Sequence, residues 1–233
     1  MKTSTVFLAN LCMLSFIIAG CGPSENDAYT VADKAYQEGD YEKAIELFTQ
    51  AAKESDNPAI YANRANCYSY LGNLDAALED YQRAIDKAIA VSNDPNDPRL
   101  AYLYYNRGYA YEHAKKYEQA LPDYEKTISL NDNYPDVKNN LAWILATCPN
   151  DKLRDPRRAV SIAEAECEKS AWKDASVLDT LAAAHAAAGD FTKAIERQRQ
   201  AIDLTEDEET KTDLQQRLDL YRNNKPFFES ATN

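Results

Sequence analysis

Small residues recur along this chain at a fixed spacing. The segment Gly39–Ala52 shows the pattern most clearly, and the same spacing returns around three further turn positions: Gly72, Lys115 and Gly189. An alanine follows each turn after five residues: Ala44, Ala77, Ala120 and Ala194. A small residue precedes each turn by seven: Ala32, Ala65, Gly108 and Ala182. Because antiparallel helices pack closely only where their facing residues are small, the pattern predicts helix pairs joined by tight turns.

Aromatic residues complete the pattern. They lie nine positions after the turn, at Phe48, Tyr81 and Tyr124, with Gln198 as the exception. Twelve positions after the turn the residues are again small: Ala51, Ala84, Thr127 and Ala201. One helix hairpin cannot bury its own apolar face, so successive copies must stack into a solenoid. We count five copies, over residues 25–57, 58–91, 101–134, 135–174 and 175–206.

This pattern resembles the tetratricopeptide repeat, a helix-turn-helix unit of about 34 residues. The resemblance implies an all-α protein, built as a right-handed superhelical solenoid of about five hairpins plus a C-terminal capping helix. We expect this solenoid over 28–222, with loop insertions near 92–100 and 148–156, where turn-forming residues interrupt the repeat. The capping helix is expected near 210–222, because Leu214, Leu218 and Tyr221 share one face of it. Residues 223–233 are expected to form a flexible tail.

An apolar run from Val6 to Ala19 lies near the N-terminus. Its 14 residues are fewer than the roughly 20 that a membrane-spanning helix needs, so they predict a signal peptide over 1–20. The run ends in Ile18-Ala19-Gly20-Cys21, which resembles the lipobox of bacterial lipoproteins; an ordinary signal-peptide cleavage site is the alternative. The resemblance implies that Cys21 is acylated and that 21–27 is a lipidated tether. Gly22, rather than aspartate, then implies the periplasmic face of the outer membrane in a Gram-negative cell.

Net charge and the positions of cysteine, histidine and acidic residues exclude several classes of function. The formal net charge is −12, so a phosphate backbone would be repelled, and we expect no nucleic-acid partner. Cys67, Cys148 and Cys167 are an odd set, for which we expect free, largely buried thiols; an intermolecular or redox role is the alternative. No histidine, cysteine or carboxylate cluster has metal-ligand spacing, and no glycine-rich loop could hold a phosphate group. We therefore expect no metal, no cofactor and no enzyme activity.

The concave face is the remaining candidate site, because the first helix of each tetratricopeptide hairpin lines it. Transferring that arrangement here predicts a peptide groove of eight residues: Asn63, Asn66, Tyr102, Tyr105, Asn106, Tyr109, Asn139 and Trp143. Aromatic rings give rigid contact area, and asparagine amides can hydrogen-bond to a peptide backbone. The alternative is that several of these tyrosines simply pack between repeats.

Some members of this family grip the C-terminal carboxylate of heat-shock chaperones, and they share the asparagine at Asn63. Their clamp also needs lysine and asparagine in the preceding repeat, and lysine and arginine in the following one. The matching residues here are Tyr29, Asp33, Tyr102 and Asn106. The clamp is therefore expected to be absent. Nearby carboxylates favour a neutral or basic partner segment instead: Asp33, Glu112, Asp136 and Asp179.

These observations predict a lipid-anchored protein of the bacterial cell envelope. It would act as a non-catalytic scaffold or adaptor that binds a protein or an extended peptide. One alternative is an assembly factor for outer-membrane proteins or pili. The other is an accessory subunit of an envelope enzyme. A repeat scaffold of this kind supports many functions, so the fold does not choose among the three.

Overall fold

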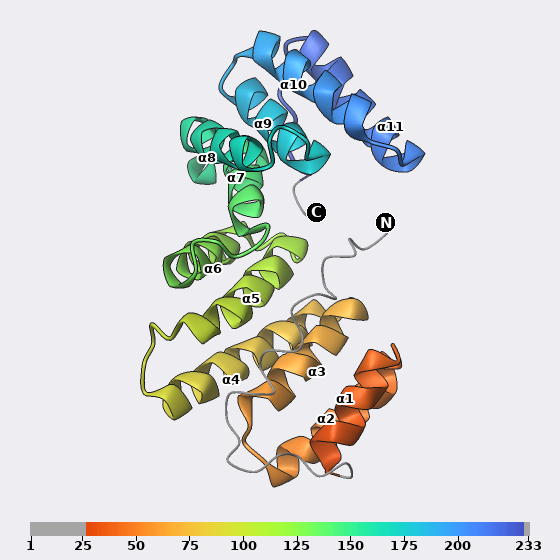
Figure 1. The fold of residues 1–233 in the computed structure, drawn as a ribbon, viewed down its shortest axis with the longest axis vertical. Coiled ribbons are helices and arrows are strands. Elements are labelled where there is room, and N and C mark those ends of the chain that lie inside the picture. Colours follow the sequence, from red (N-terminus) through yellow and green to blue (C-terminus); the bar gives the residue numbers. More distant parts are fainter. Residues whose placement is uncertain (1–26, 231–233) are drawn as a thin grey trace. The chain divides into compact units, whose positions relative to one another are not determined.

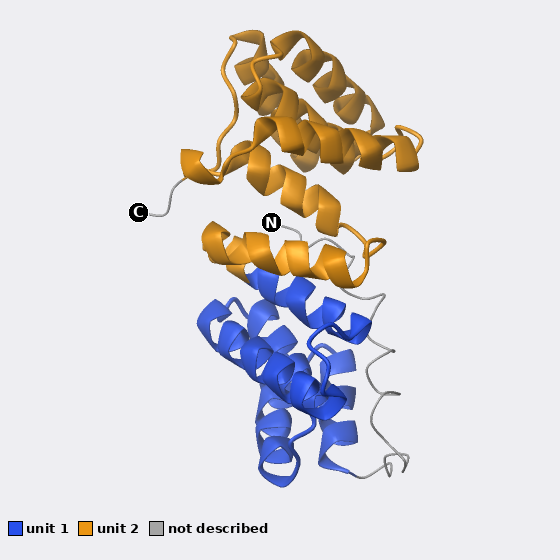
Figure 2. Ribbon diagram, turned by 90° about the vertical axis from the view of Figure 1, so that its left-hand side faces the viewer, with its two compact units in different colours: residues 1–110 blue, residues 111–233 orange. Residues whose placement is uncertain are grey.

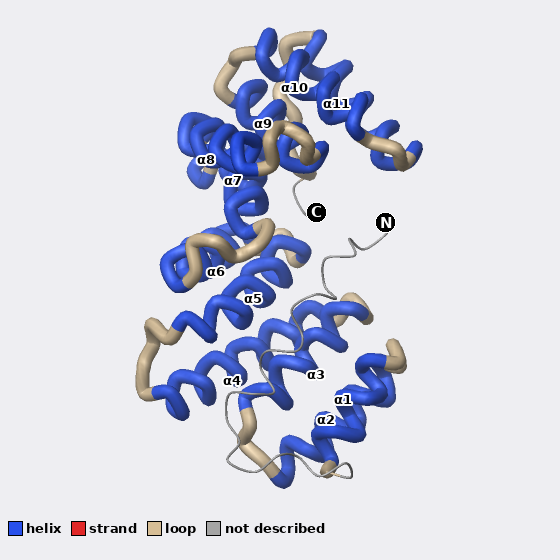
Figure 3. Tube along the Cα trace, viewed as in Figure 1, coloured by secondary structure: helices blue, strands red, loops and turns tan. Residues whose placement is uncertain are grey.

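The computed structural model describes residues 27–230. The predicted signal peptide, Cys21 and all but the last residue of the predicted tether lie outside this range. Within it the chain is helical, with no strand (Figures 1 and 3). The elements in order are α1 (Ala28–Gln37), α2 (Tyr41–Glu54), α3 (Pro58–Tyr70), α4 (Leu74–Ser92), η3 (Pro98–Leu100), α5 (Ala101–His113), α6 (Tyr117–Leu130), α7 (Val137–Thr147), η4 (Asp151–Leu153), α8 (Pro156–Lys169), α9 (Ala175–Ala187), α10 (Phe191–Leu204) and α11 (Glu208–Arg222).

The helices fall into two compact units, residues 1–110 and 111–233, and the boundary lies within α5 (Figure 2). The described part of unit 1 holds α1 to α4, η3 and most of α5. Unit 2 holds the end of α5 and the helices from α6 to α11.

The helix hairpins confirm the repeat pattern. All four alanines five positions after the turn are fully buried, as are Phe48, Tyr81 and Tyr124 nine positions after it. The small residues before the turn are buried as well. Small side chains therefore lie where paired helices meet, and the aromatic rings fill the space beside them. The fold class predicted from the sequence is correct: an all-α chain of tetratricopeptide-type hairpins followed by a capping helix.

Backbone geometry explains the turn residues. Gly39, Gly72 and Gly189 have φ of 79°, 75° and 85°, in the left-handed region that glycine enters without steric cost. After these turns the next helix begins at a capping side chain, at Asp40, Asn73 and Asp190, which accepts a backbone N–H three residues on.

The third hairpin departs from this turn chemistry. Lys115 adopts φ of 58° in the glycine position. Lys116 stands at the start of α6, where it makes no side-chain cap. A non-glycine residue in the left-handed region is strained, so this turn is more costly than its three counterparts.

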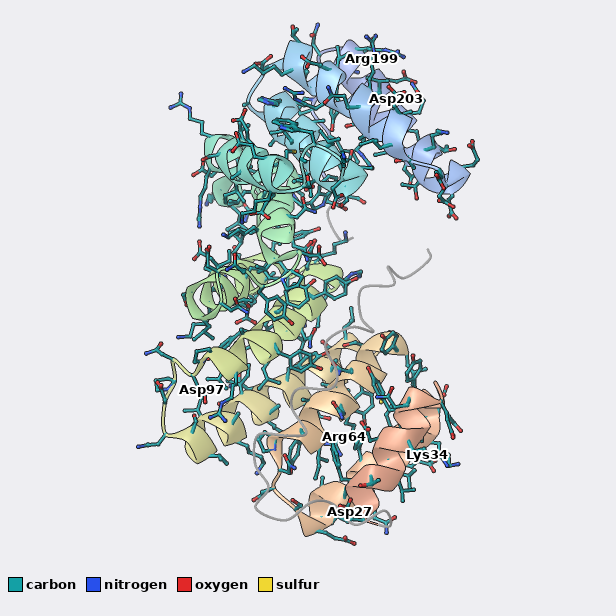
Figure 4. The ribbon with its side chains drawn as sticks, viewed as in Figure 1. Asp27, Lys34, Arg64, Asp97, Arg199 and Asp203 are labelled. Carbon is teal, nitrogen blue, oxygen red and sulfur yellow. The ribbon has the colours of Figure 1, made fainter. Side chains whose placement is uncertain are left out.

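The predicted insertions are loops that carry short 3₁₀ helices. Asp97, labelled in Figure 4, lies between α4 and α5 and caps the start of η3, where its carboxylate accepts hydrogen bonds from Arg99. In repeat four, η4 lies between α7 and α8. No helix in residues 27–230 combines the length and the apolar character needed to span a bilayer.

The capping helix buries the face that its sequence predicts. Leu214, Leu218 and Tyr221 of α11 are at most 3% exposed. Beyond α11 the chain continues as loop to residue 230 (Figure 3). The sequence predicts a flexible tail here, yet the described part of it makes specific contacts in unit 2. The backbone N–H of Glu229 donates to the carbonyl of Thr147 at 2.8 Å.

Candidate functional site

Six of the eight predicted groove residues belong to unit 1, where they lie on α3 and α5. Asn63 of α3 reaches back to α1: its side-chain nitrogen donates to the Tyr29 hydroxyl at 3.1 Å and to Asp33 Oδ1 at 3.2 Å. Asn66, one turn further along α3, donates to the Tyr102 hydroxyl of α5 at 2.6 Å. These hydrogen bonds connect the first helices of three consecutive repeats. Side chains far apart in the sequence therefore share one surface.

Asn66 also has a structural role. It is fully buried, and its side-chain oxygen accepts a hydrogen bond from the Tyr81 hydroxyl of α4 at 2.7 Å. Both ends of this amide are thus engaged within unit 1. For Asn66, packing and hydrogen bonding between repeats explain the residue without a ligand.

Tyr105, Asn106 and Tyr109 form the α5 part of the predicted groove. The Tyr105 and Tyr109 rings are stacked with centroids 6.3 Å apart, and both side chains are partly exposed. Asn106 is buried, and its side-chain nitrogen has no hydrogen-bond partner within residues 27–230. A buried donor without an acceptor is costly. The Tyr102 hydroxyl partly meets this need, since its interaction with Asn106 opposes the rise that burial causes in the pKa of Tyr102.

The heat-shock carboxylate clamp has no counterpart around Asn63. Its amide faces a phenol and a carboxylate, at Tyr29 and Asp33, where the clamp would need a lysine and an asparagine. Burial raises the pKa of Asp33, which shows that its surroundings do not stabilise added negative charge. An anionic peptide terminus is disfavoured at this point.

Asn139 and Trp143, the other two predicted residues, belong to α7 of unit 2. The Asn139 side-chain nitrogen lies 3.4 Å from the Ser176 hydroxyl of α9. Trp143 contacts the chain's own C-terminal segment. Its ring centroid lies 5.8 Å from that of Phe227, and its indole N–H donates to Glu229 Oε1 at 3.3 Å.

Sequence reasoning missed four residues around Trp143. Lys115 binds Glu229, and Arg217 lies beside both Trp143 and Phe227. The sequence does mark Lys115 as unusual, because it is a lysine at a turn position where three other hairpins have glycine. Nothing in the sequence marks Glu229, since its partner Lys115 is 114 residues away.

Two carboxylates predicted to make the groove acidic are already engaged in unit 2. Asp179 is buried and accepts two hydrogen bonds from Arg217, each 2.9 Å long, so its charge is paired. Burial raises the pKa of Glu112 to about 7, and the charge of Glu229 adds to that effect. The Tyr124 hydroxyl, which donates to Glu112, acts in the opposite direction.

The three cysteines within the described range are free and buried, as predicted. Burial raises the pKa of Cys67 to about 12 and that of Cys167 to about 11. No group of three or more histidine, cysteine or acidic side chains within residues 27–230 is arranged to hold a metal ion.

Comparison with known families supports the repeat assignment. Profiles of the tetratricopeptide repeat match residues 56–133 and 175–207. The chain carries tetratricopeptide repeats. Proteins built from this repeat generally serve as scaffolds for protein–protein interaction.

Solved structures with the same fold cover most of the chain. A peptide-binding tetratricopeptide protein, YrrB, is 18% identical and aligns over 81% of this chain and 90% of its own, with a TM-score of 0.65. The C-terminal part of a tetratricopeptide protein from Cytophaga hutchinsonii is 18% identical over 84% of this chain and 71% of its own, with a TM-score of 0.63. MamA is 19% identical over 78% and 97% of the two chains, with a TM-score of 0.62. At these identities the likeness shows the fold.

A curated relative matches a shorter stretch. The heat shock protein STI1 of Saccharomyces cerevisiae is 42% identical over 53 residues, which are 22% of this chain and 9% of the yeast protein. The matched stretch thus spans less than a tenth of that protein's length.

Proposed function

We propose that this protein is a lipid-anchored scaffold of the bacterial cell envelope, which binds a partner through its repeats without catalysis. The hydrogen bonds that connect α1, α3 and α5 carry the binding part of the proposal. They support a shared surface on unit 1 made of Asn63, Tyr102 and the Tyr105–Tyr109 pair. We call these residues, with Asn106, the tyrosine surface.

The chemistry of the tyrosine surface favours a neutral or basic extended segment. Stacked phenol rings offer rigid contact area with little loss of side-chain entropy. Asp33, in hydrogen-bond contact with Asn63, attracts a cationic side chain and repels a carboxylate.

The experiment compares what co-purifies with the full-length protein from crosslinked, gently solubilised envelopes. The test variant combines Tyr105→Ala and Asn106→Ala. Tyr104→Ala is the matched control, since this tyrosine lies on the same helix but contacts Arg107, which bonds to Gln82 of α4. We expect partners to be retained by the wild type and the control and lost from the test variant. Equal retention by all three folded proteins would exclude the tyrosine surface as the binding site.

The anchor is tested separately with Cys21→Ser. The lipobox-like sequence that ends at Cys21 supports acylation there. We expect labelled palmitate on the wild type, and loss of both the label and membrane fractionation in the variant. An unlabelled wild type would contradict the anchor, and the ordinary cleavage site would replace it. Co-purified porins, pilus components or an envelope enzyme would assign the scaffold to one of the roles that the sequence leaves open.

A further inference from the structure

The C-terminal segment occupies a defined place in unit 2. The Glu229 carboxylate accepts hydrogen bonds from Lys115 Nζ at 2.9 Å and from the Trp143 indole N–H at 3.3 Å. Its backbone N–H donates to the Thr147 carbonyl at 2.8 Å. Two residues earlier, the Phe227 ring contacts Trp143. One aromatic side chain, one carboxylate and one backbone group are thus recognised together.

Two arginines beside this segment are held in place by other parts of unit 2. Arg217 lies 5.6 Å from the Trp143 ring centroid and 5.5 Å from that of Phe227, while Asp179 binds its guanidinium through two hydrogen bonds. Arg154 lies 4.2 Å from the Phe228 ring centroid and donates to the carbonyls of Cys148 and Pro149. Both cations are therefore oriented by contacts that do not involve the tail, so the surface is organised before the segment binds.

The backbone conformation of Lys115 also indicates a binding role for this residue. Three hairpins place glycine at this turn position, whereas here lysine is held at φ of 58°. Strained backbone persists where another interaction compensates for it, and such sites are often functional. Here the compensating interaction is the ion pair between the Lys115 ammonium group and Glu229. The repeat departs from its own pattern at the residue that binds the carboxylate.

We propose that Lys115, Trp143, Thr147, Arg154 and Arg217 form a recognition site for an extended protein segment with an aromatic residue and, two positions later, a carboxylate. We call these five residues the Trp143 surface. Residues 226–229 occupy it as an internal ligand, which a partner segment of the same chemistry displaces. This proposal rests on the proposed scaffold function and adds a second surface with the opposite charge preference.

A purely structural role of the tail is the competing explanation. Phe227 also packs against the buried cluster of Ala182, Ala186, Ala194 and Tyr221, so it contributes to the core of unit 2. Closing a core, however, needs no carboxylate and no lysine in a glycine position. The partly exposed ion pair between Lys115 and Glu229 and the exposed Phe228 are features of recognition. The test must therefore separate binding from folding.

The test uses a chain that ends at Lys225 and a fluorescent peptide with the sequence of residues 224–231. We expect the shortened protein to keep its helical circular dichroism and to bind the peptide, as measured by fluorescence anisotropy. Full-length protein should bind at least 10-fold more weakly, because its attached tail competes at an effective concentration in the millimolar range. Peptides with Phe227→Ala or Glu229→Gln should each bind at least 10-fold more weakly, and a peptide of scrambled order should not bind.

Protein variants give the matched control on the other side of the interface. Lys115→Gly in the shortened chain should weaken binding of the wild-type peptide at least 10-fold. Binding of the Glu229→Gln peptide should not change, because the ammonium group that is removed pairs with the Glu229 carboxylate. Trp143 emission should shift when the peptide binds. Trp172, which contacts Arg197, can be replaced by phenylalanine so that the tryptophan emission comes from Trp143 alone.

Three outcomes would overturn the proposal. The first is a folded shortened chain that fails to bind the peptide at 1 mM concentration, on the order of the effective concentration of a tethered segment. The second is unfolding of both the shortened chain and a full-length Phe227→Ala, Glu229→Gln double variant, which would make the tail part of the core. The third is dimerisation of the full-length protein that truncation abolishes, which would assign the tail to a second copy. None of these affects partner retention through the tyrosine surface, so failure here leaves the scaffold proposal standing.

Discussion

Arg64 and Asp80 form a buried ion pair that joins the two helices of the second hairpin. The guanidinium donates to both carboxylate oxygens, at 2.6 and 2.8 Å, and Arg64 also donates to Thr49 of α2. Arg64, labelled in Figure 4, lies among the helices of unit 1. Both side chains are at most 9% exposed, so each charge depends on its partner for stabilisation.

Replacing Asp80 alone should therefore be strongly destabilising. We expect Asp80→Ala to lower the free energy of unfolding by about 3–5 kcal/mol, since it leaves Arg64 buried without a counter-charge. Urea unfolding followed by circular dichroism measures this. Glu79→Ala, at an exposed neighbouring position, should change stability by less than about 0.5 kcal/mol. Equal midpoints for the two variants would show that the Arg64 charge is solvated rather than buried.

Glu112 gives unit 2 a predicted dependence on pH. Its pKa is raised from the ordinary 4.5 to about 7, first because of burial and then because Glu229 is near. Between these two values the folded protein holds a proton that the unfolded chain releases. The stabilisation is therefore complete below pH 4.5 and is lost as the pH rises through 7.

Glu112→Gln should remove this dependence. Because the side chain is partly exposed, we expect the variant to gain on the order of 1 kcal/mol over the wild type at pH 8, and no gain at pH 5. Thermal unfolding at the two pH values measures the difference. Glu118→Gln removes the same charge from an exposed position and serves as the control. A wild-type stability that does not fall between pH 5 and 8 would contradict the assignment.

At the scale of the element, the contact between α10 and α11 includes a buried amide at the position where the first three hairpins have an aromatic ring. Gln198 of α10 stands where the first three hairpins carry Phe48, Tyr81 and Tyr124. Its side-chain nitrogen donates to Asp179 Oδ1 at 2.8 Å and to the Leu214 carbonyl of α11 at 3.1 Å. The fifth hairpin packs on a single capping helix instead of another hairpin, and the amide satisfies buried polar groups that this packing brings together.

The capping helix should contribute to stability through its apolar face. Leu214 is 3% exposed and packs in a core cluster with Leu178 and Leu181 of α9. We expect Leu214→Ala to cost about 2–5 kcal/mol, from lost burial and from the cavity it leaves. Gln216→Ala, two positions on and exposed, should change the unfolding midpoint little. Equal chemical-denaturation curves for these variants would show that α11 detaches before the hairpins unfold.

At the scale of the whole molecule, the buried thiols report on the two units separately. Cys67 lies in unit 1, whereas Cys148 and Cys167 lie in unit 2. Burial raises the pKa of each thiol. The reactive thiolate is therefore scarce in the folded protein, and reagent access is blocked as well.

We expect negligible reaction of the native protein with a thiol reagent over a time in which the denatured chain reacts completely. Mass spectrometry after pulse labelling in increasing urea then follows Cys67 and Cys167 individually. Coincident labelling would show that the repeats unfold as one cooperative array, while separate transitions would give each unit its own stability. Rapid labelling of either thiol without denaturant would contradict its burial.

The sequence by itself determined the architecture. A hairpin's two helices meet at residues near one another in the chain, so the alanine, aromatic and turn columns are local and repeat with the unit. Gly39, Gly72 and Gly189 could be predicted because a left-handed turn favours glycine for backbone reasons alone. The same locality predicts the apolar face of α11. Position in the repeat also predicted that Asn63, Tyr102 and Trp143 lie on first helices, as they do. That these residues bind a partner stays a prediction.

Only the tertiary structure decided what those side chains contact. Asn66 hydrogen-bonds to Tyr81 and Tyr102. Trp143 contacts the Phe227 ring and donates a hydrogen bond to Glu229. No periodicity relates Lys115 to a residue 114 positions later. Such a pair forms because the folded helices bring the chain's end against α7, and its attraction depends on a distance that the order of residues does not encode.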